Sequence, residues 1–493
     1  MKKIIVIGAG IAGLAAATRL RAKGHDVLVI EQASGPGGKL REAKQDQFRF
    51  DLGPSLFTLP ELVKEVLSEG DLPPSTFPYE QLDRSCHYFW EDGTELIAYH
   101  DKEKLAQEID KKIGINTSDK TNSEGVLAHL KHSAFLYDYT AELFMHRSLH
   151  KFKSYLSKTV LRALFKVHKF DLGKSLHEAN KARFKDPKLV QLFDRYATYN
   201  GSDPYRAPGV LNIIPHLEHN IGTFFPKEGM YQITNSIYER AKALGVEFKF
   251  NTSCKQIVVE GNKVQGVELD TEFIPADLVV SNADVFSTYR NLLKNQKAPE
   301  KTLQSEPSSS AIIFYWGVKG SFPKLHLHNI LFSEDYQGEF KALFDGDQLH
   351  PDPTVYINIT SKLKKDDAPE GHENWFVMIN APANSGQDWG KWIPQARENM
   401  LNKIQRTLGT DIRDEIIVED ILDPTLIEKR TSSHMGALYG TSSNDRMAAF
   451  LRHPNFSQDL KGLYFCGGSV HPGGGIPLCL LSAKIVDELI SNA

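Results

Sequence analysis

The fold is decided by the stretch Lys2-Lys3-Ile4-Ile5-Val6-Ile7-Gly8-Ala9-Gly10-Ile11-Ala12-Gly13. Its β-branched residues predict a strand, its glycines a tight turn, and residues 14–21 a helix, which is the context that gives a G-x-G-x-x-G motif its meaning. Gly8 permits the turn, Gly10 lets the backbone approach a pyrophosphate, and Gly13 lets the helix pack close to the strand. The phosphates of a dinucleotide would lie at the free N–H groups of the helix start. An unrelated glycine turn is the alternative, which the strand–turn–helix order disfavours.

A second strand supports this interpretation. Residues 26–30 are mostly apolar and lead directly to Glu31, whose carboxylate is placed to bind a hydroxyl of an adenosine ribose. We therefore predict an α/β fold with a Rossmann-like dinucleotide-binding domain of the glutathione reductase type.

The residues after Glu31 favour FAD over NAD as the dinucleotide. An NAD domain would continue into further βαβ units, whereas here a glycine doublet follows at once in Gly37-Gly38-Lys39. Near the C-terminus a strand and a glycine-rich turn precede His471-Pro472-Gly473-Gly474-Gly475-Ile476-Pro477 and an apolar helix at 478–490. FAD is long, so its ring end needs a second set of contacts. A helix beginning near Pro477 would direct its positive end at the flavin pyrimidine.

These motifs resemble those of the phytoene desaturase-type carotenoid desaturases, within the FAD-dependent amine oxidase-like flavoproteins. The matching pieces span the chain in family order, and they are Gly8 to Gly13, Gly37-Gly38-Lys39, Phe50-Asp51-Leu52-Gly53-Pro54-Ser55, the run from Tyr199 to Pro208, Pro226 to Met230, and Gly467 to Pro477. The pieces at 203–208 and 471–477 are more specific to the desaturases than the first two. In one departure, Leu478 follows the final proline where the family usually has glycine. We expect this change to reshape the pocket near the flavin ring.

The motifs and the resemblance together predict the residues that contact the cofactor. They are Gly8, Gly10, Ile11, Ala12, Gly13, Glu31, Gln32, Gly38, Lys39, Leu40, Gly53, Pro54, Ser55, Cys254, Gly467, Gly468, Ile476 and Pro477. Cys254 is included by resemblance alone, because it falls where the family's backbone touches the adenine side.

The resemblance implies an FAD-dependent carotenoid desaturase, in which an allylic C–H gives a hydride to the flavin N5 and loss of a neighbouring proton completes a new C=C bond. Within the family the chain is most similar to bacterial 3,4-desaturases of hydroxylated or monocyclic, γ-carotene-type carotenoids. A phytoene- or lycopene-type desaturase and a flavin-dependent carotene cis–trans isomerase remain alternatives. An amine or porphyrinogen oxidase and a non-catalytic prenyl-lipid escort protein are further alternatives, which the absence of an identifiable aromatic pair and the retained glycine motif disfavour.

Three residues are candidates for polar groups in the reacting site: Asp203, Arg206 and His471. Each has a structural alternative, because Asp203 and Arg206 can order a turn around Pro204 and His471 can cap the glycine loop. No second G-x-G-x-x-G follows a strand in the sequence. This favours oxygen or a membrane quinone, rather than NAD(P)H, as the partner that reoxidises the flavin.

The composition is that of an ordinary globular protein, with 41% hydrophobic and 24% charged residues. A net charge of −4 gives no reason to expect nucleic acid as a partner. The four cysteines are scattered without a C-x-x-C pair, which argues against a zinc site, so no metal is predicted, and against an extracellular disulfide framework. We expect a cytoplasmic protein, and no stretch of about 18 apolar residues predicts a membrane-spanning helix.

The chain is expected to form two interleaved domains. The FAD-binding domain is assigned to residues 1–74, 225–289 and 426–493. The mixed β-sheet and helical substrate-binding domain is assigned to 75–224 and 290–425. Strands expected at 311–318, 354–359 and 374–380 would form the floor of a substrate cavity.

Residues 141–174 form a candidate membrane-associating helix. Apolar residues recur from Leu149 at spacings of three and four, and they are Leu149, Phe152, Leu156, Val160, Leu164 and Val167. The opposite side is basic, with Arg147, Lys151, Lys158, Arg162, Lys166 and Lys169. A basic amphipathic helix can lie in the membrane interface, although most amphipathic helices pack on their own protein. The resemblance favours the membrane, because carotenoids dissolve there, and implies peripheral attachment to the cytoplasmic membrane.

Overall fold

The N-terminal glycine motif lies at the carboxyl end of the central strand of a five-stranded parallel sheet. The computed structural model describes residues 1–114, 121–156, 158–445 and 452–492. The sheet order is β19–β13–β1–β2–β9, with all neighbours parallel. Its strands are β1 (Lys3–Ile7), β2 (Asp26–Ile30), β9 (Glu247–Lys249), β13 (Leu278–Ser281) and β19 (Leu463–Phe465). Parallel strands share the edge at their carboxyl ends, so segments far apart in sequence bring Gly8, Glu31 and Asn282 together there.

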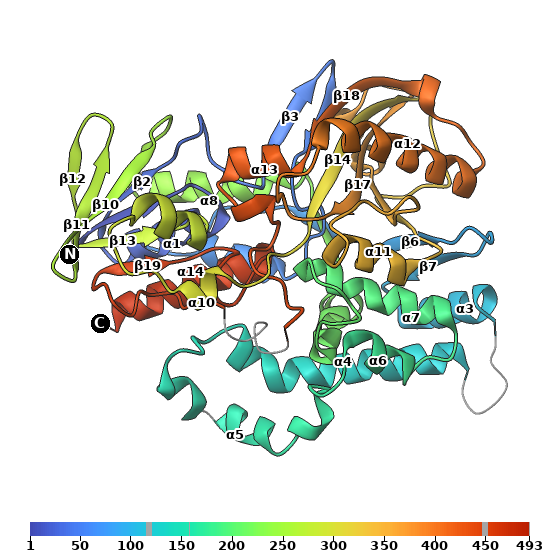
Figure 1. Cartoon of the computed structure of the whole chain (residues 1–493), viewed down its shortest axis with the longest axis horizontal. Helices are drawn as coiled ribbons and strands as arrows, with labels where there is room; N and C mark the ends of the chain where they lie inside the picture. The colour runs from blue at the N-terminus through green and yellow to red at the C-terminus, as the bar shows by residue number, and fades with distance from the viewer. Residues whose placement is uncertain (115–120, 157, 446–451, 493) are drawn as a thin grey trace.

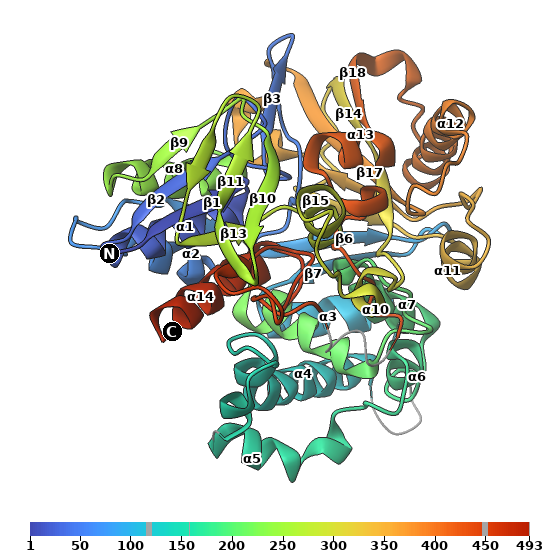
Figure 2. The same ribbon diagram turned by 60° about the vertical axis from the view of Figure 1, so that its left-hand side comes forward.

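Helices cover one face of this sheet and a small antiparallel sheet covers the other. The helices are α1 (Ile11–Ala22), α2 (Pro60–Leu67), α8 (Tyr231–Ala243) and α14 (Ile476–Ser491). Alanines at 12 and 15–17 are buried in α1 and let it pack closely against α8 and α14. The second sheet holds β10 (Cys254–Glu260), β11 (Lys263–Leu269) and β12 (Phe273–Pro275), in front in Figure 2. The predicted α/β, Rossmann-like class is confirmed.

A seven-stranded mixed sheet forms the other half of the molecule, at the upper right of Figure 1. In order its strands are β18 (Ile416–Leu422), β14 (Ser310–Lys319), β17 (His372–Ala381), β16 (Val355–Asn358), β15 (His328–Leu331), β6 (Arg84–Phe89) and β7 (Glu95–Tyr99). Alternate residues of β14 face opposite sides. Phe314 and Trp316 pack in the core that includes α12 (Trp389–Leu408), whereas Ile313 packs in the core that includes Phe48 and Phe50. The strands predicted at 311–318, 354–359 and 374–380 are confirmed.

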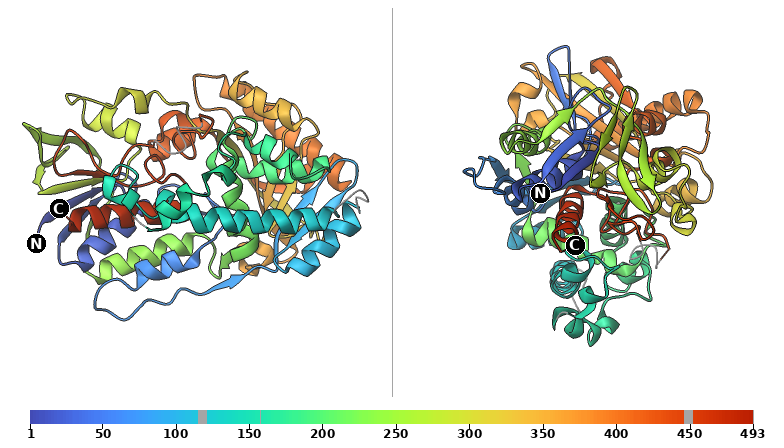
Figure 3. Two further views of the ribbon diagram at one scale, coloured as in Figure 1. Left: turned by 90° about the horizontal axis from the view of Figure 1, so that it is seen from below. Right: turned by 90° about the vertical axis from the view of Figure 1, so that its left-hand side faces the viewer.

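A helical region lies below both sheets in Figure 1, and Figure 3 shows its longest helix crossing the underside of the molecule. It contains α3 (Lys102–Lys112), α4 (Asn122–Phe144), α6 (Leu176–Lys181) and α7 (Pro187–Asp194), with short turns η3 (Arg195–Asn200), η4 (Gly209–Ile213) and η5 (His216–Ile221). The remaining elements are β3 (Glu42–Gln45), β4 (Phe48–Asp51), β5 (Tyr79–Gln81), β8 (Phe224–Pro226), α9 (Val285–Ser287), α10 (Glu300–Leu303), α11 (Tyr336–Phe344) and α13 (Pro424–Thr431). No helix in the described ranges is both long enough and apolar enough to cross a bilayer.

The prediction of one amphipathic helix running on from Leu149 is wrong. The segment forms three short helical pieces, η1 (Phe152–Leu156), α5 (Lys158–Leu164) and η2 (Val167–Lys169). One physical reason is local, because Ser154 Oγ and Tyr155 OH donate to the carbonyls of residues 148 and 149, which compete with helical bonding. The apolar stripe is also divided, since Val160 is buried whereas Phe152 and Leu164 are exposed. The side chains of Leu156 and Lys158 lie outside the described ones.

Candidate active site

A cavity of about 1010 Å³ is lined by residues of both halves of the molecule. Of the residues predicted to contact a cofactor, all but Gly13 line it: Gly8, Gly10, Ile11, Ala12, Glu31, Gln32, Gly38, Lys39, Leu40, Gly53, Pro54, Ser55, Cys254, Gly467, Gly468, Ile476 and Pro477. The structure therefore brings together segments from the two ends of the chain and from its middle. Their roles as cofactor contacts stay predictions.

The glycine turn is packed so tightly that side chains would not fit. A Cβ on Gly13 would lie 2.2 Å from the Gly8 carbonyl oxygen, so Gly13 brings the helix against the turn without reaching the cavity. A Cβ on Gly10 would lie 2.7 Å from Asn282 Nδ2. Gly8 has a φ of +97°, which side-chain-bearing residues rarely adopt. Bare backbone therefore forms the floor at this end of the cavity.

Glu31 is held at the end of β2 by two backbone groups. The Ala9 N–H donates to Glu31 Oε2 at 2.7 Å, and the Ala33 N–H donates to Oε1 at 2.8 Å. Each carboxylate oxygen retains capacity to accept a further hydrogen bond. Glu31 also lines the cavity, so its position suits contact with ribose hydroxyls.

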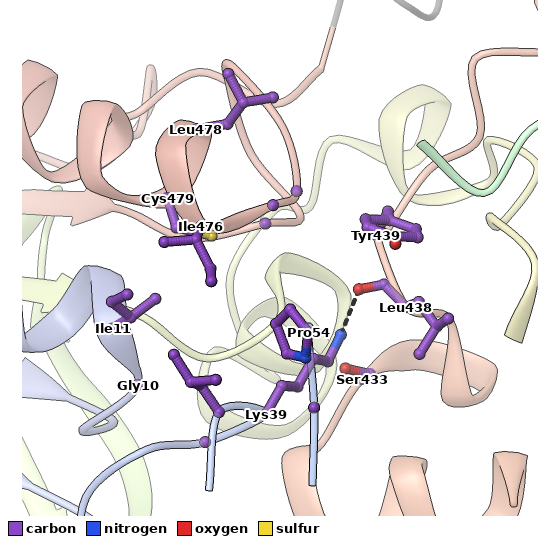
Figure 4. Close-up of a pocket in the computed structure, with 18 of the residues that line it drawn as sticks. Gly10, Ile11, Lys39, Pro54, Ser433, Leu438, Tyr439, Ile476, Leu478 and Cys479 are labelled. Carbon is purple, nitrogen blue, oxygen red and sulfur yellow. Dashed lines mark hydrogen bonds between the residues drawn. The ribbon is translucent and has the colours of Figure 1, made fainter. Parts of the chain in front are cut away.

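Two helices begin at this cavity without side-chain caps. Gly10 precedes α1 and Gly475 precedes α14, and neither helix start is capped by a side chain. The uncapped N–H groups and the helix dipoles make both ends favourable for negative charge. Figure 4 labels Ile11 and Ile476, the first residues of these two helices. With the bare glycine floor and Glu31, these groups fit a long dinucleotide such as FAD.

Lys39 links the predicted cofactor segment to a distant loop. Its Nζ donates to the carbonyls of Ala437 (3.0 Å) and Leu438 (2.8 Å), the second of which is drawn in Figure 4. Burial lowers the pKa of Lys39 below its usual range. Arg452 donates from Nη1 to the carbonyl of Tyr439 at 2.9 Å, and burial lowers its pKa to about 10. The loop is therefore fixed by two buried cations.

His471 is the one catalytic candidate that lines the cavity. Its Nε2 lies 2.7 Å from the carbonyl oxygen of Arg147, which can only accept, so Nε2 carries the proton and Nδ1 is left as an acceptor. Burial lowers the pKa of His471 to about 4, so the ring is neutral at physiological pH. The hydrogen bond also ties the glycine-rich C-terminal loop to the segment after α4.

Asp203 and Arg206 do not line the cavity. Asp203 Oδ1 accepts from the Tyr205 N–H at 2.8 Å, and the Asp203 N–H donates to Asn444 at 2.7 Å. Arg206 is partly exposed and pairs with Glu306 at 3.1 Å. Burial raises the pKa of Asp203 to about 6. These contacts fit the turn-ordering alternative, and a catalytic role for either residue stays a prediction.

The rest of the cavity wall is largely apolar. One side comes from α4 and the following turns, and its apolar residues are Phe144, Met145, Leu149, Val210, Leu211, Ile213, Ile214 and Leu217. The opposite side comes from the seven-stranded sheet, with Ile313, Ile330, Phe376, Met378 and Leu422. Such a wall suits a hydrocarbon ligand.

Sequence reasoning missed Asn282, which packs against Gly8, Gly10, Gly13 and Gly467. A signal was present, because Asn282 directly follows a buried strand, where side chains reach the carboxyl edge of a parallel sheet. It also missed Arg452 and Tyr439. For these no local pattern exists, since only the tertiary fold brings their loops to the cavity.

Comparisons with known proteins agree with this geometry. The family described as flavin containing amine oxidoreductase matches residues 11–486. A 1-hydroxycarotenoid 3,4-desaturase from Flavobacterium sp. (strain P99-3) is 52% identical over 100% of this chain and 99% of its own length. A 4,4'-diapolycopene oxygenase from Methylomonas sp. is 31% identical over 100% of this chain and 98% of its own. The crystal structure of an oxidoreductase from Methanosarcina mazei has a TM-score of 0.63 at 17% identity, over 99% of this chain and 100% of that one.

Proposed function

The chain belongs to the flavin containing amine oxidoreductases, and on that premise we propose that it is an FAD-dependent 3,4-desaturase of a hydroxylated carotenoid. The observation that carries the proposal is a single cavity. Dinucleotide-motif residues line one part of it and a largely apolar wall lines the rest, an arrangement that would bring a hydrocarbon against a flavin. The 52% identity to a 1-hydroxycarotenoid 3,4-desaturase supports this substrate over phytoene or lycopene.

The protein's own residues position the reactants. Glu31 and the glycine floor would hold the adenosine and pyrophosphate, and the start of α14 would face the ring end. The bound flavin supplies a hydride acceptor. The apolar wall orients the polyene and excludes water, so a positive charge left on the conjugated chain is not trapped by hydroxide.

We assign the proton-accepting role to His471 Nδ1. The Arg147 carbonyl fixes the tautomer in which Nδ1 has a free lone pair. A pKa of about 4 makes it a weak base, but a C–H beside a delocalised cation is strongly acidic, so a weak base suffices. A His471→Gln variant should retain flavin and lose turnover, and normal turnover would remove the assignment.

An anaerobic experiment tests the activity. FAD-loaded protein is mixed with liposomes that carry a 1-hydroxylated carotenoid, γ-carotene, lycopene or phytoene, and flavin absorbance is followed. We expect bleaching with the hydroxylated carotenoid to be fastest. If every pigment leaves the flavin oxidised, and a pigment isomer forms only after chemical reduction of the flavin, the protein is an isomerase instead.

We also propose peripheral attachment to an anionic membrane at the cytoplasmic face. The patch consists of the exposed side chains Phe152, Tyr155, Leu164, Phe165 and Val167, with Arg162, Lys166 and Lys169 among them in sequence. Figure 1 places α5 at the lower edge of the molecule. Leu149 lines the cavity and lies three residues before Phe152, so the patch follows closely in sequence on a part of the cavity wall. Apolar groups among cations suit the interface of an anionic membrane.

The electron acceptor is proposed to be oxygen or a membrane quinone. The chain carries one dinucleotide motif of the G-x-G-x-x-G type after a strand, and Glu31 belongs to it. Reoxidation of the reduced protein should be faster in aerated buffer or in quinone-loaded vesicles than with NAD(P)⁺. Fast reoxidation by NAD(P)⁺ alone would contradict this proposal.

A further inference from the structure

Three polar side chains form a hydrogen-bonded relay in the largely apolar cavity wall. Ser55 Oγ lies 2.6 Å from Tyr356 OH, and Tyr356 OH lies 2.7 Å from His328 Nδ1. All three residues line the cavity. Ser55 follows Gly53 and Pro54 of the predicted cofactor segment, whereas Tyr356 and His328 belong to β16 and β15 of the seven-stranded sheet. The relay therefore spans the junction of the two parts of the cavity.

The direction of each hydrogen bond in this relay follows from its neighbours. Asn358 Nδ2 donates to the Leu327 carbonyl at 3.0 Å and to His328 Nδ1 at 3.1 Å, so Nδ1 carries no proton. Burial lowers the pKa of His328 to about 4, which keeps its ring neutral. Tyr356 must then donate to His328, and Ser55 must donate to Tyr356. The hydroxyl protons of Tyr356 and Ser55 are both used, while their oxygens keep lone pairs that can accept. The remaining proton of the relay is on His328 Nε2, which is buried and has no hydrogen-bond partner among the described residues.

A second polar cluster in the same wall consists of Arg195, Glu218 and Tyr199, which bond to one another. Arg195 Nη2 lies 2.8 Å from Glu218 Oε1, and the Tyr199 hydroxyl donates to Glu218 Oε2 at 2.7 Å. The charges of Arg195 and Glu218 neutralise each other, so this cluster gives no reason to expect a charged ligand. A ligand whose polar group meets the relay is therefore neutral, and it offers an O–H to the free acceptors.

The chemistry of the proposed substrate matches this position. In a 1-hydroxycarotenoid that is desaturated at the 3,4-bond, the hydroxyl lies two carbons from the reacting bond. Its subsite must consequently adjoin the cofactor rather than the far end of the cavity. The relay meets that requirement, because Ser55 belongs to the predicted cofactor segment.

We propose that the Ser55–Tyr356–His328 relay is the subsite that accepts a hydrogen bond from the terminal hydroxyl of the carotenoid, with Tyr356 as a specificity-determining residue. The proposal rests on the proposed function. A carotenoid without the hydroxyl leaves the acceptors unpaired, and a site built for a hydroxyl disfavours an analogue that lacks it.

The test compares Tyr356→Phe with the unaltered protein. Each FAD-loaded protein receives a 1-hydroxylated carotenoid or the same carotenoid without the hydroxyl, and kcat/KM is measured from anaerobic flavin bleaching. We expect the unaltered protein to prefer the hydroxylated substrate. In Tyr356→Phe that preference should fall roughly tenfold, with the loss confined to the hydroxylated substrate.

Tyr336→Phe is the matched control, since Tyr336 also lines the cavity but lies outside the relay. It should keep the preference. If Tyr356→Phe does not hold FAD, the test uses Ser55→Ala, which removes the other accepting oxygen. An effect of this substitution on the flavin would change the rates with both substrates equally, so it does not alter the ratio of the two kcat/KM values. An unchanged preference in the relay variant, or no preference in the unaltered protein, overturns the subsite. No bleaching with either carotenoid contradicts the proposed function instead.

Discussion

The missing Cβ of Gly13 is what allows α1 to pack against the glycine turn. The residue touches no part of the cavity, yet a Cβ there would lie 2.2 Å from the Gly8 carbonyl oxygen. Since that oxygen belongs to the backbone of the turn, the turn itself would have to move. The consequence would reach Gly8 and Gly10, which do line the cavity.

Gly13→Ala should therefore lose most of its FAD. We expect a flavin-to-protein absorbance ratio well below that of the unaltered protein and a destabilisation of roughly 1–3 kcal/mol from overpacking. Gly35→Ala is the control, because a Cβ at Gly35 meets nothing within 4 Å. Full flavin content in Gly13→Ala would show that the close packing of turn and helix is dispensable.

A substitution at Leu478 should change the fit of the substrate without changing the binding of the cofactor. It lines the cavity and packs beside Leu59, Met145 and Leu481, on the side of α4. Leu478→Ala should keep its flavin, lose about 1–2 kcal/mol of stability because the side chain is only partly buried, and accept bulkier end groups. Absorbance, urea unfolding and bleaching rates with a set of carotenoids measure these effects. Loss of flavin would instead place Leu478 among the cofactor contacts.

At the scale of elements, the segment after α4 shows what periodicity captures and what it misses. The spacing of apolar residues correctly marks helical structure around α5, where Ala163 packs in one core with Leu136 of α4. It does not reveal that Phe165, which is 81% exposed, points away from the protein. The exposed set rather than the predicted stripe defines the proposed membrane patch.

Reversing the charges of this patch should release the protein from membranes. Arg162→Glu, Lys166→Glu and Lys169→Glu together should abolish flotation with anionic liposomes and leave flavin content unchanged, because anionic headgroups would repel the new carboxylates. Undiminished flotation of this triple variant would mean that the protein does not attach through this patch.

The control for flotation is a triple reversal far from the patch. Lys242 on α8 and Lys255 on β10 are exposed and Lys249 on β9 is half-buried, and Figure 2 labels these elements at the upper left. Changing them to Glu alters net charge equally and should leave flotation intact. A separate Phe152→Ser and Phe165→Ser variant should weaken binding also to neutral liposomes, since it removes apolar area rather than charge.

For the whole molecule, buried histidines predict sensitivity to acid. Burial lowers the pKa to about 4 for His87, His219, His328, His453 and His471. Below the unfolded pKa of about 6.5 each takes up a proton when unfolded but not when folded, so stability falls from about pH 6.5 toward 4, by roughly 1 kcal/mol per pH unit for each group.

Buried carboxyls act in the opposite direction. Burial raises the pKa of Asp203 to about 6 and of Glu339 to about 7, and it also raises the pKa of Asp194, Asp284, Asp367 and Glu488. They bind protons at a higher pH when folded, which stabilises the folded state in acid. The histidines with a lowered pKa are more numerous, because burial also lowers the pKa of His25, His129, His326 and His434. The melting temperature should therefore be several degrees lower at pH 5 than at pH 7.5. Thermal unfolding of the FAD-loaded protein at the two pH values and equal ionic strength measures this difference in melting temperature. A melting temperature that rises on acidification would contradict the prediction.

The cofactor half of the molecule was predictable because its signals are local. Glycines at 8, 10 and 13, and Glu31 after a buried strand, each carry a meaning at fixed spacing. The relay of Ser55, Tyr356 and His328 was not predictable. Ser55 and Tyr356 are 301 positions apart in the sequence, and only the tertiary fold brings them together. Tyr356 and His328 are 28 positions apart and meet through the pairing of β15 with β16.

The central claim is oxidative desaturation, and the composition of the product tests it most directly. FAD-loaded protein is incubated with liposomes that contain a 1-hydroxylated carotenoid, and the product is separated and weighed by mass spectrometry beside its absorption spectrum. We predict a pigment two hydrogens lighter that absorbs at longer wavelength, with no oxygen gained. A product of unchanged mass would make the protein an isomerase, and one heavier by an oxygen atom would make it an oxygenase, like the activity named for its Methylomonas relative.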